Sequence, residues 1–219
     1  MRNTLILAAL LAAAPFAASA EGMSYTYVEA GYAHLKIDSE DLGSPTGSGA
    51  YVRGSFAIAP QVFVFGSYSR VSKTDRINDL FGLPGNQDDL RIKYTVSQPE
   101  VGIGYHMEFT EKLDFVADVS YQQLELKVKA SISGASDSDS DKLEIGRVTA
   151  GVRGKPSPRT EAWVKAGYFD GSNVDQLFNN QVVGIAGLQV NITPTWGIVG
   201  EMQFYDGAQQ GTLGVRASF

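Results

Sequence analysis

The sequence predicts an all-β fold: a closed antiparallel up-and-down transmembrane β-barrel of about ten strands. Three observations support this prediction. Apolar and polar residues alternate with period two along most of the chain, the connections are alternately short and long, and the last strand ends in an aromatic residue. Glycine accounts for 24 of the 219 residues and charged residues for 19%, against about 7% and about 25% in average domains. This composition suits a sheet with two contrasting faces.

The first twenty residues form a separate segment. Met1-Arg2-Asn3 is positively charged, an apolar run follows from Leu5 to Leu11, and Ala18-Ser19-Ala20 supplies small residues for cleavage. This order is typical of a signal peptide, and the run is shorter than the ~20 apolar residues of a membrane-spanning helix. We expect residues 1–20 to be removed, which changes the net charge from −6 to −7, and residues 21–219 to form one barrel domain in the bacterial outer membrane.

Period-two alternation locates the strands. Around residue 100, for example, Val101, Ile103 and Tyr105 alternate with Gly102 and Gly104. The expected strands cover residues 24–37, 49–59, 62–72, 93–108, 113–130, 143–154, 161–169, 181–192, 196–205 and 210–219. Eight or twelve strands remain open as alternatives.

The connections between these strands predict how the barrel is oriented. Long polar loops are expected at 38–48, 73–92, 131–142 and 170–180, and they alternate with short turns such as Ala59-Pro60-Gln61. Short periplasmic turns and long extracellular loops are typical of outer-membrane barrels. An even number of strands also places both chain ends on the periplasmic side.

Alternation alone does not say which face points outward, so a soluble lipocalin-like barrel is the structural alternative. Glycines gather on the polar face, which favours a crowded interior on that side. Aromatic residues near the strand ends of the apolar face predict girdles at the two lipid–water levels. The residues expected in these girdles are Tyr32, Tyr68, Tyr105, Tyr121, Tyr168 and Trp196.

The polar face carries charges of both signs, which are expected to form a lumen charge network. Its expected members are Glu29, Arg53, Glu100, Asp118, Arg147, Arg153, Lys165, Glu201 and Arg216. Charges in a narrow barrel must pair, because an isolated buried charge is costly. Ten strands enclose little more space than eight, whose interior side chains already fill. The sequence therefore favours a mostly filled lumen over an ion-selective pore.

Several classes of function are disfavoured by composition. The acidic balance and the lack of basic runs argue against a nucleic-acid partner. The absence of cysteine removes cysteine-ligated metals and thiol catalysis. We expect no cofactor and no metal site. The expected partners are outer-membrane lipids, lipopolysaccharide and the barrel assembly machinery, for which the C-terminal Phe219 resembles a recognition signal.

Two histidines are the candidates for enzymatic chemistry. His106 is expected inside the barrel near the periplasmic turn, the wrong end for cleaving extracellular substrates. His34 precedes the acidic residues Asp38, Glu40 and Asp41, and a histidine beside such a loop is usually only solvated. We therefore predict that the protein is not an enzyme.

Two of the expected loops have unusual compositions. In Ser136–Asp141, aspartate occupies every second position as in a calcium-binding EF-hand, but Lys142 and Val148 stand where that motif needs glycine and glutamate. We expect a flexible acidic loop, with divalent-cation binding as a weaker hypothesis. The loop at 73–92 contains Ile77, Leu80, Phe81 and Leu83, for which we expect either a short helix or cap folded over the barrel mouth or contact with a surface partner.

Several short blocks resemble one known family. They are Ser24–Tyr32, Val64–Ser69, Val101–Tyr105, Ala150–Arg153, Ala166–Ser172 and Trp196-Gly197. In this order they resemble small exported outer-membrane β-barrels of plant-pathogenic and environmental gammaproteobacteria, once labelled quorum or immunity-eliciting factors. The resemblance covers the chain from the signal peptide to Phe219, apart from longer loops at 73–92 and 131–142. It implies the barrel fold and supplies no catalytic or binding residues.

Two functions follow as expectations. The first is a porin-like or structural outer-membrane barrel with a mostly filled, charged lumen. The second is a surface adhesin or recognition protein that acts through its extracellular loops. The solute, the loop ligand and the oligomeric state are left open by the sequence.

Overall fold

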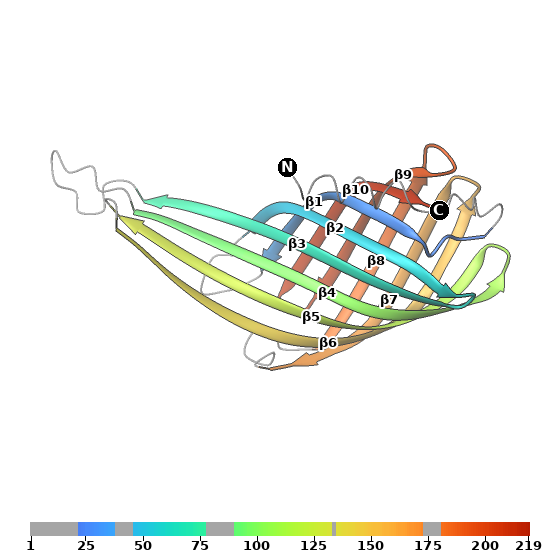
Figure 1. Cartoon of the computed structure of the whole chain (residues 1–219), viewed down its shortest axis with the longest axis horizontal. Helices are drawn as coiled ribbons and strands as arrows, with labels where there is room; N and C mark the ends of the chain where they lie inside the picture. The colour runs from blue at the N-terminus through green and yellow to red at the C-terminus, as the bar shows by residue number, and fades with distance from the viewer. Residues whose placement is uncertain (1–21, 38–45, 78–89, 133–134, 173–180) are drawn as a thin grey trace.

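The computed structural model describes residues 22–37, 46–77, 90–132, 135–172 and 181–219. Ten strands form the fold, and Figure 1 shows them wrapped into a barrel. Their bounds are β1 (Tyr27–Ile37), β2 (Thr46–Ala59), β3 (Val62–Ile77), β4 (Leu90–Thr110), β5 (Leu113–Ile132), β6 (Ala135–Ser157), β7 (Thr160–Gly171), β8 (Val182–Asn191), β9 (Trp196–Tyr205) and β10 (Ala208–Ser218). The predicted fold class and the count of ten are confirmed.

Each strand pairs antiparallel with its neighbours in sequence, and β1 pairs with β10 to close the barrel. The closing pair runs from Tyr27 opposite Ser218 to Ile37 opposite Ala208. Closure provides strand partners for backbone groups that would otherwise lie at an open edge. The turn between β9 and β10 uses Gly207 at φ 87°, a conformation that favours glycine. In the described part of the chain, no helix is long and apolar enough to cross a membrane.

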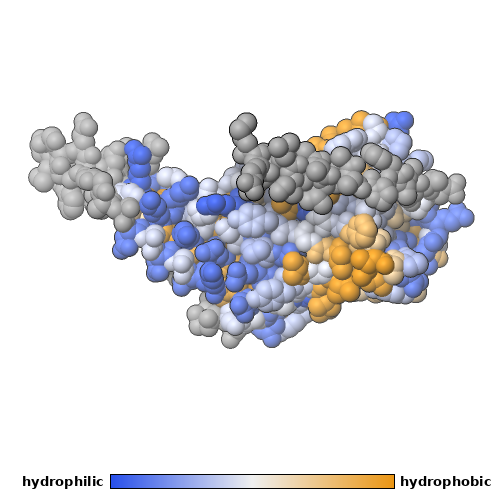
Figure 2. Space-filling view, viewed as in Figure 1, coloured by the Kyte–Doolittle hydropathy of each residue, from blue (hydrophilic) through white to orange (hydrophobic). Residues whose placement is uncertain are grey.

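The apolar face of the sheet points outward. Val101, Ile192 and Leu213 are each more than 60% exposed, and they belong to a large set of exposed apolar side chains around the barrel. Figure 2 shows hydrophobic side chains gathered over the barrel and hydrophilic ones toward the far end of β3–β6. A soluble barrel would direct its apolar face inward, so the lipocalin-like alternative is wrong.

The strands differ in length, and this difference shapes the molecule. β1, β2 and β7–β10 contain 10 to 14 residues, whereas β3, β4, β5 and β6 contain 16, 21, 20 and 23. Figure 1 shows the four long strands extending together well past the other strands. We call this extension the projecting sheet and define it as residues 73–77, 90–97, 123–132 and 135–144.

The projecting sheet corrects two predicted loops. The prediction of a flexible acidic loop is wrong, because Asp137, Asp139 and Asp141 lie in β6 and pair with Ala130, Val128 and Leu126 of β5. Alternation of serine and aspartate has the period of a strand, and the alternating apolar residues of β5 provide its partner. The predicted loop at 73–92 is shorter than expected, because β3 continues to Ile77 and β4 begins at Leu90. Leu80, Phe81 and Leu83 lie outside the described residues.

Neither edge of the projecting sheet has a strand partner within the part of the chain that the structure describes. Pairing between β2 and β3 ends at Ser48 opposite Ser72, and pairing between β6 and β7 ends at Ile145 opposite Gly171. Among the described residues, 135–143 of β6 therefore have no strand partner on the β7 side, over a length of about 30 Å.

Candidate functional site: the charged lumen

The lumen is lined by the inward-facing residues of all ten strands. The nine charged residues expected there lie on this face. Seven of them are buried, and the side chains of Arg53 and Lys165 are 13% and 19% exposed. Each of the five cations among them forms an ion pair with a carboxylate.

Glu29 on β1 is the centre of one group of contacts. Its register partners on the two neighbouring strands are Arg216 and Arg53. Arg216 Nε lies 2.7 Å from Glu29 Oε2, and the Tyr51 hydroxyl donates to Glu29 Oε1 at 2.7 Å. Arg53 completes the group at 3.6 Å. The Arg216 guanidinium also stacks 3.9 Å from the centre of the Tyr27 ring. Strand register thus places one carboxylate between two guanidinium groups.

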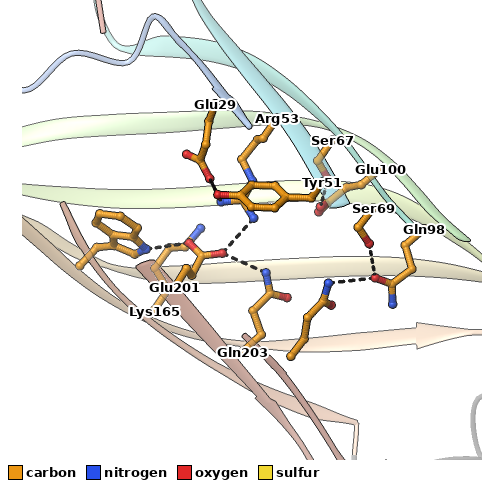
Figure 3. A network of polar contacts seen from close by, with 12 residues as sticks. Glu29, Tyr51, Arg53, Ser67, Ser69, Gln98, Glu100, Lys165, Glu201 and Gln203 are labelled. Carbon is orange, nitrogen blue, oxygen red and sulfur yellow. Dashed lines mark hydrogen bonds and ion pairs between the residues drawn. The ribbon is translucent and has the colours of Figure 1, made fainter. Parts of the chain in front are cut away.

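Glu201 on β9 receives three donors. Arg53 Nη2 and Gln203 Nε2 both lie 3.0 Å from Oε1, and the Trp163 indole donates to Oε2 at 2.8 Å. Figure 3 shows Arg53 reaching from β2 toward Glu201, with Glu29 on its other side. Because Arg53 contacts carboxylates of β1 and β9, this chain of contacts crosses the lumen.

A second group of charges lies on the opposite wall. Arg147 of β6 pairs with Glu100 of β4, and Lys165 Nζ lies 2.8 Å from Asp118 Oδ2. Arg147 also donates to Gln203 Oε1 at 3.2 Å. Gln203 therefore contacts both Arg147 and Glu201 and joins the two groups of charges.

The short-turn end of the lumen is occupied by the segment that precedes β1. Tyr25 is 6% exposed, and its hydroxyl donates to Asp114 Oδ2 at 2.7 Å. Burial raises the pKa of the Tyr25 phenol, which favours the neutral, donating form. The Tyr25 ring stacks on His106 with centroids 3.8 Å apart. Arg153 donates to Glu161 from Nε at 3.1 Å and to the Ser24 carbonyl at 3.0 Å.

The sequence interpretation missed several lumen residues. Tyr25, Tyr51, Asp114 and Glu161 were not among the expected members, although all four bond to an expected charge or to each other. Successive residues of a strand point alternately inward and outward, so each strand has one inward-facing set of alternate residues, which we call its inward parity. This rule places Tyr51, Asp114 and Glu161 on the inward face of β2, β5 and β7. Tyr25 precedes β1, so no strand pattern places it.

Glycine and aromatic residues fit together on the lumen wall. A Cβ atom at Gly187 would lie 2.1 Å from the Trp163 ring, and one at Gly104 would lie 2.2 Å from the Phe63 ring. These large rings fill the interior directly over glycines of adjacent strands. The glycines on the polar face are therefore needed for close approach.

Two cavities lie within the lumen. The central cavity is about 90 Å³ and is lined by Arg53, Glu100, Arg147, Lys165 and Glu201, among others. A second cavity of about 20 Å³, nearer the long-loop end, is lined partly by Gln98 and Gln210. The central cavity has room for several water molecules.

The two histidines lie on different faces of the barrel wall. His106 Nδ1 lies 3.6 Å from Asp114 Oδ2 inside the short-turn end. His34 is on the outward face, and its Nδ1 lies 3.0 Å from Ser48 Oγ. Asp38, Glu40 and Asp41, which follow His34 in the sequence, lie outside the described residues.

The acidic segment of β6 is spread out along one strand. Asp137 and Asp139 each accept a bond from the following backbone N–H, donated by Ser138 and Ser140 at 2.8 Å. Across the described ranges, no group of three or more acidic or histidine side chains could hold a metal ion.

The aromatic residues expected in the girdles all lie on the outward face, where each is 39% to 53% exposed. Their grouping at two membrane levels stays a prediction. The C-terminal Phe219 is tied to the start of the barrel, since its backbone N–H donates to the Thr26 carbonyl at 2.9 Å and its carbonyl accepts from Ser24 Oγ at 2.7 Å. Its role in assembly also stays a prediction.

Comparisons with known proteins agree with the architecture. Residues 4–218 match the family model described as outer membrane protein beta-barrel domain. No curated protein sequence matches the chain. The outer membrane protease OmpT of Escherichia coli is 9% identical over 89% of this chain and 96% of its own, with a TM-score of 0.52. The transport unit of the E. coli autotransporter AIDA-I is 11% identical over 99% and 98%, with a TM-score of 0.50.

A third solved structure is the attachment invasion locus protein Ail of Yersinia pestis, in complex with the heparin analogue sucrose octasulfate. It is 15% identical over 89% of this chain and 97% of its own, with a TM-score of 0.49. At such low identity, the similarity to OmpT and AIDA-I shows the fold alone.

Proposed function

We propose that this chain, which belongs to the outer membrane protein β-barrel domain family, is a non-conducting barrel that holds the projecting sheet at the cell surface for recognition. The barrel is the membrane anchor in this proposal, and the projecting sheet together with the long connections is the binding part. This combines the structural role with the adhesin-like role that the sequence left open.

The observation that carries the proposal is the chain of ion pairs across the lumen. Arg53 links Glu29 of β1 to Glu201 of β9 at 3.6 and 3.0 Å. An ion that passed would have to break these buried pairs, and each broken pair leaves an unpaired charge that costs about 3–5 kcal/mol. A sealed lumen leaves the surface as the place where the protein can act.

The direction of the projecting sheet follows from the chain ends. Both ends of the barrel, at Tyr27 and Ser218, lie on the short-turn side. In outer-membrane barrels this side is periplasmic. The projecting sheet, on the opposite side, would then extend into the extracellular space.

Porin-like conduction is the second candidate function. The mixed charges around the central cavity of about 90 Å³ favour it, because charged rings set selectivity in narrow channels. Conduction requires the ion pairs of the lumen to rearrange, whereas the non-conducting barrel requires them to stay formed.

Recording from planar lipid bilayers separates the two candidates. We expect the refolded wild-type barrel to show no stepwise conductance. We expect Arg53→Ala and Glu201→Ala to introduce small steps, because each removes part of the barrier. Stepwise currents in the wild type that change in Arg153→Ala or Glu201→Ala would instead establish a channel and overturn the proposal.

A non-enzymatic role is part of the same proposal. The His34–Ser48 pair is the arrangement most able to challenge it, because a histidine beside a serine can activate the hydroxyl. We expect no hydrolysis of acyl-ester lipids by the wild type. Hydrolysis that disappears in His34→Ala would contradict this part of the proposal.

Three further elements of the proposal concern export and origin. Residues 1–20 would be removed as a signal peptide, and Phe219 would be read by the barrel assembly machinery. The chain would belong to the narrower family of gammaproteobacterial barrels once labelled quorum or immunity-eliciting factors. N-terminal sequencing of the mature protein tests the first element, and a new N-terminus at Glu21 is expected.

A further inference from the structure

The outward face of the projecting sheet carries an unusual group of positive charges. Arg91 and Lys93 lie on β4, and Lys127 and Lys129 lie on β5. All four are exposed. We call these residues the basic quartet.

Strand register places the quartet together. Lys93 is directly opposite Lys129, Lys127 is opposite Thr95, and Arg91 is opposite Ser131. Side chains directly opposite lie about 5 Å apart at Cβ, and diagonal neighbours about 7–8 Å apart. The four cations therefore form one continuous group, with two lysines side by side.

Like charges directly opposite each other destabilise a sheet. No ion pair in the described part of the chain joins any of the four to an acidic residue. The nearest acid on this face is Glu125, which is partly buried and lies opposite Lys142. Like charges that destabilise a sheet and have no neutralising ion pair are expected mainly at functional positions.

The aspartates of the projecting sheet and the basic quartet lie on opposite faces, and Glu125 and Glu144 share the outward face with the quartet. Asp75 of β3 and Asp137, Asp139 and Asp141 of β6 have the inward parity, whereas the quartet has the outward parity. This arrangement occurs in a chain with a net charge of −6. The outward cations thus form a local positive surface on an acidic protein, which attracts a ligand with several negative charges.

The quartet is continuous with the lipid-facing surface of the barrel. Tyr121, 47% exposed, has the same parity on β5 as Lys127 and precedes it by six residues. Six residues of strand span about 20 Å, and a tilt of 35–45° reduces this to about 15 Å of height. The quartet therefore lies beyond the apolar belt, beside the headgroups of the outer leaflet.

We propose that the basic quartet binds the phosphate groups on the headgroup and core sugars of lipopolysaccharide in the surrounding membrane. Phosphates attract lysine and arginine through charge-assisted hydrogen bonds. The serines and threonines on either side, Thr74, Ser138 and Ser140, add hydroxyl donors on the same face. Binding would hold the outward face of the projecting sheet against the lipopolysaccharide layer and leave the other face for other contacts.

This inference rests on the proposed function for the extracellular position of the sheet. The test titrates deacylated lipopolysaccharide, a soluble phosphorylated core oligosaccharide, into the refolded full-length mature barrel in zwitterionic micelles, followed by calorimetry. We expect binding that weakens as salt is added. The variant Arg91→Gln, Lys93→Gln, Lys127→Gln, Lys129→Gln should bind at least about tenfold more weakly.

A matched control removes positive charge at the other end of the barrel. Lys112→Gln with Arg159→Gln, two exposed residues of the short turns, should bind as the wild type does. Replacing Lys93, Lys127 and Lys129 by arginine should preserve binding. Should the fourfold variant fail to refold, Lys93→Gln with Lys129→Gln is the substitute, because removing two opposed like charges should not weaken the sheet.

Three results would overturn the inference. The first is equal binding by the wild type and the glutamine variants. The second is equal binding of core oligosaccharide from which the phosphates have been removed. The third is binding of heparin without binding of the phosphorylated core, which would assign the quartet to a free sulfated glycan. Conductance of the wild type would refute the proposed function but would leave these titrations unchanged, so the two failures are distinguishable.

Discussion

The lumen and the projecting sheet use charge in opposite ways. In the lumen, Arg53 and Arg216 share the carboxylate of Glu29, and every expected cation has an acidic partner. On the outward face of the projecting sheet, Lys93 lies opposite Lys129, and the aspartates at 137, 139 and 141 are on the other face. The same alternating strands thus build a neutralised interior and an unneutralised exterior.

The difference follows from what surrounds each region. Charges in the narrow interior lose water and must find partners within the protein. Charges on the projecting sheet remain in contact with solvent or with headgroups, so pairing within the sheet contributes little. In the proposed function, the buried charges close the lumen and the exposed charges serve recognition.

The sharpest test of the contrast is Glu29→Ala. Losing this carboxylate leaves Arg216 buried without its closest acidic partner, so we expect a loss of about 3–5 kcal/mol in the free energy of unfolding. Lys73→Ala is the matched control, because its pair with Asp75 at 3.4 Å is on the projecting sheet and both side chains are more than a third exposed. The Lys73→Ala control should change the free energy of unfolding by less than about 1 kcal/mol. Urea unfolding in micelles measures both, and equal effects would remove the distinction between interior and exterior.

A second test compares two glycines of one strand, β8. Gly187→Ala places a Cβ 2.1 Å from the Trp163 ring, whereas a Cβ at Gly184 meets nothing within 4 Å. We expect Gly187→Ala to cost about 1–3 kcal/mol through overpacking. Gly184→Ala should be neutral or slightly stabilising, since glycine weakens strands. Similar unfolding midpoints for the two variants would show that the lumen is not tightly packed beside the Trp163 ring.

A third test addresses the free edge of β6. Aspartates at 137, 139 and 141 put a charge on every second residue of an edge strand that pairs with β5 on one side only in the described structure, a feature that discourages pairing with other chains. Replacing all three by valine should change the free energy of unfolding little. It should, however, shift the refolded protein from one species to larger assemblies in size-exclusion chromatography, whereas Asp→Asn at the three positions should give a smaller shift. A valine variant that remains a single species would contradict this role.

The sequence predicts the barrel well where apolar residues repeat at every second position. Val101, Ile103 and Tyr105 do so, and the structure places them outward. Prediction failed at Asp137–Asp141, because a strand without apolar residues looks like a disordered segment until its partner in β5 is known. The sequence did not show how long β5 and β6 are. They remain paired with each other beyond the end of β7, and this is a property of the assembled sheet.

The sequence predicts which residues face the lumen, but not which of them contact each other. Alternation assigns Glu29, Arg53 and Glu201 to one face, yet only closure of β1 on β10 brings β2 within reach of β9. Tyr25 illustrates a further limit, because its position at the short-turn end depends on how the segment before β1 folds back. A single sequence contains no periodic signal for such a segment.

Labelling of intact cells tests the central claim, display of the projecting sheet outside the cell, most directly. The chain has no cysteine, so single cysteines give unambiguous positions. Ser140→Cys lies on the projecting sheet and Ser157→Cys near a short turn, and both residues are exposed. We predict that a membrane-impermeant maleimide labels Ser140→Cys in intact cells and labels Ser157→Cys only after lysis. The reverse pattern, or labelling of neither variant before lysis, would contradict the account.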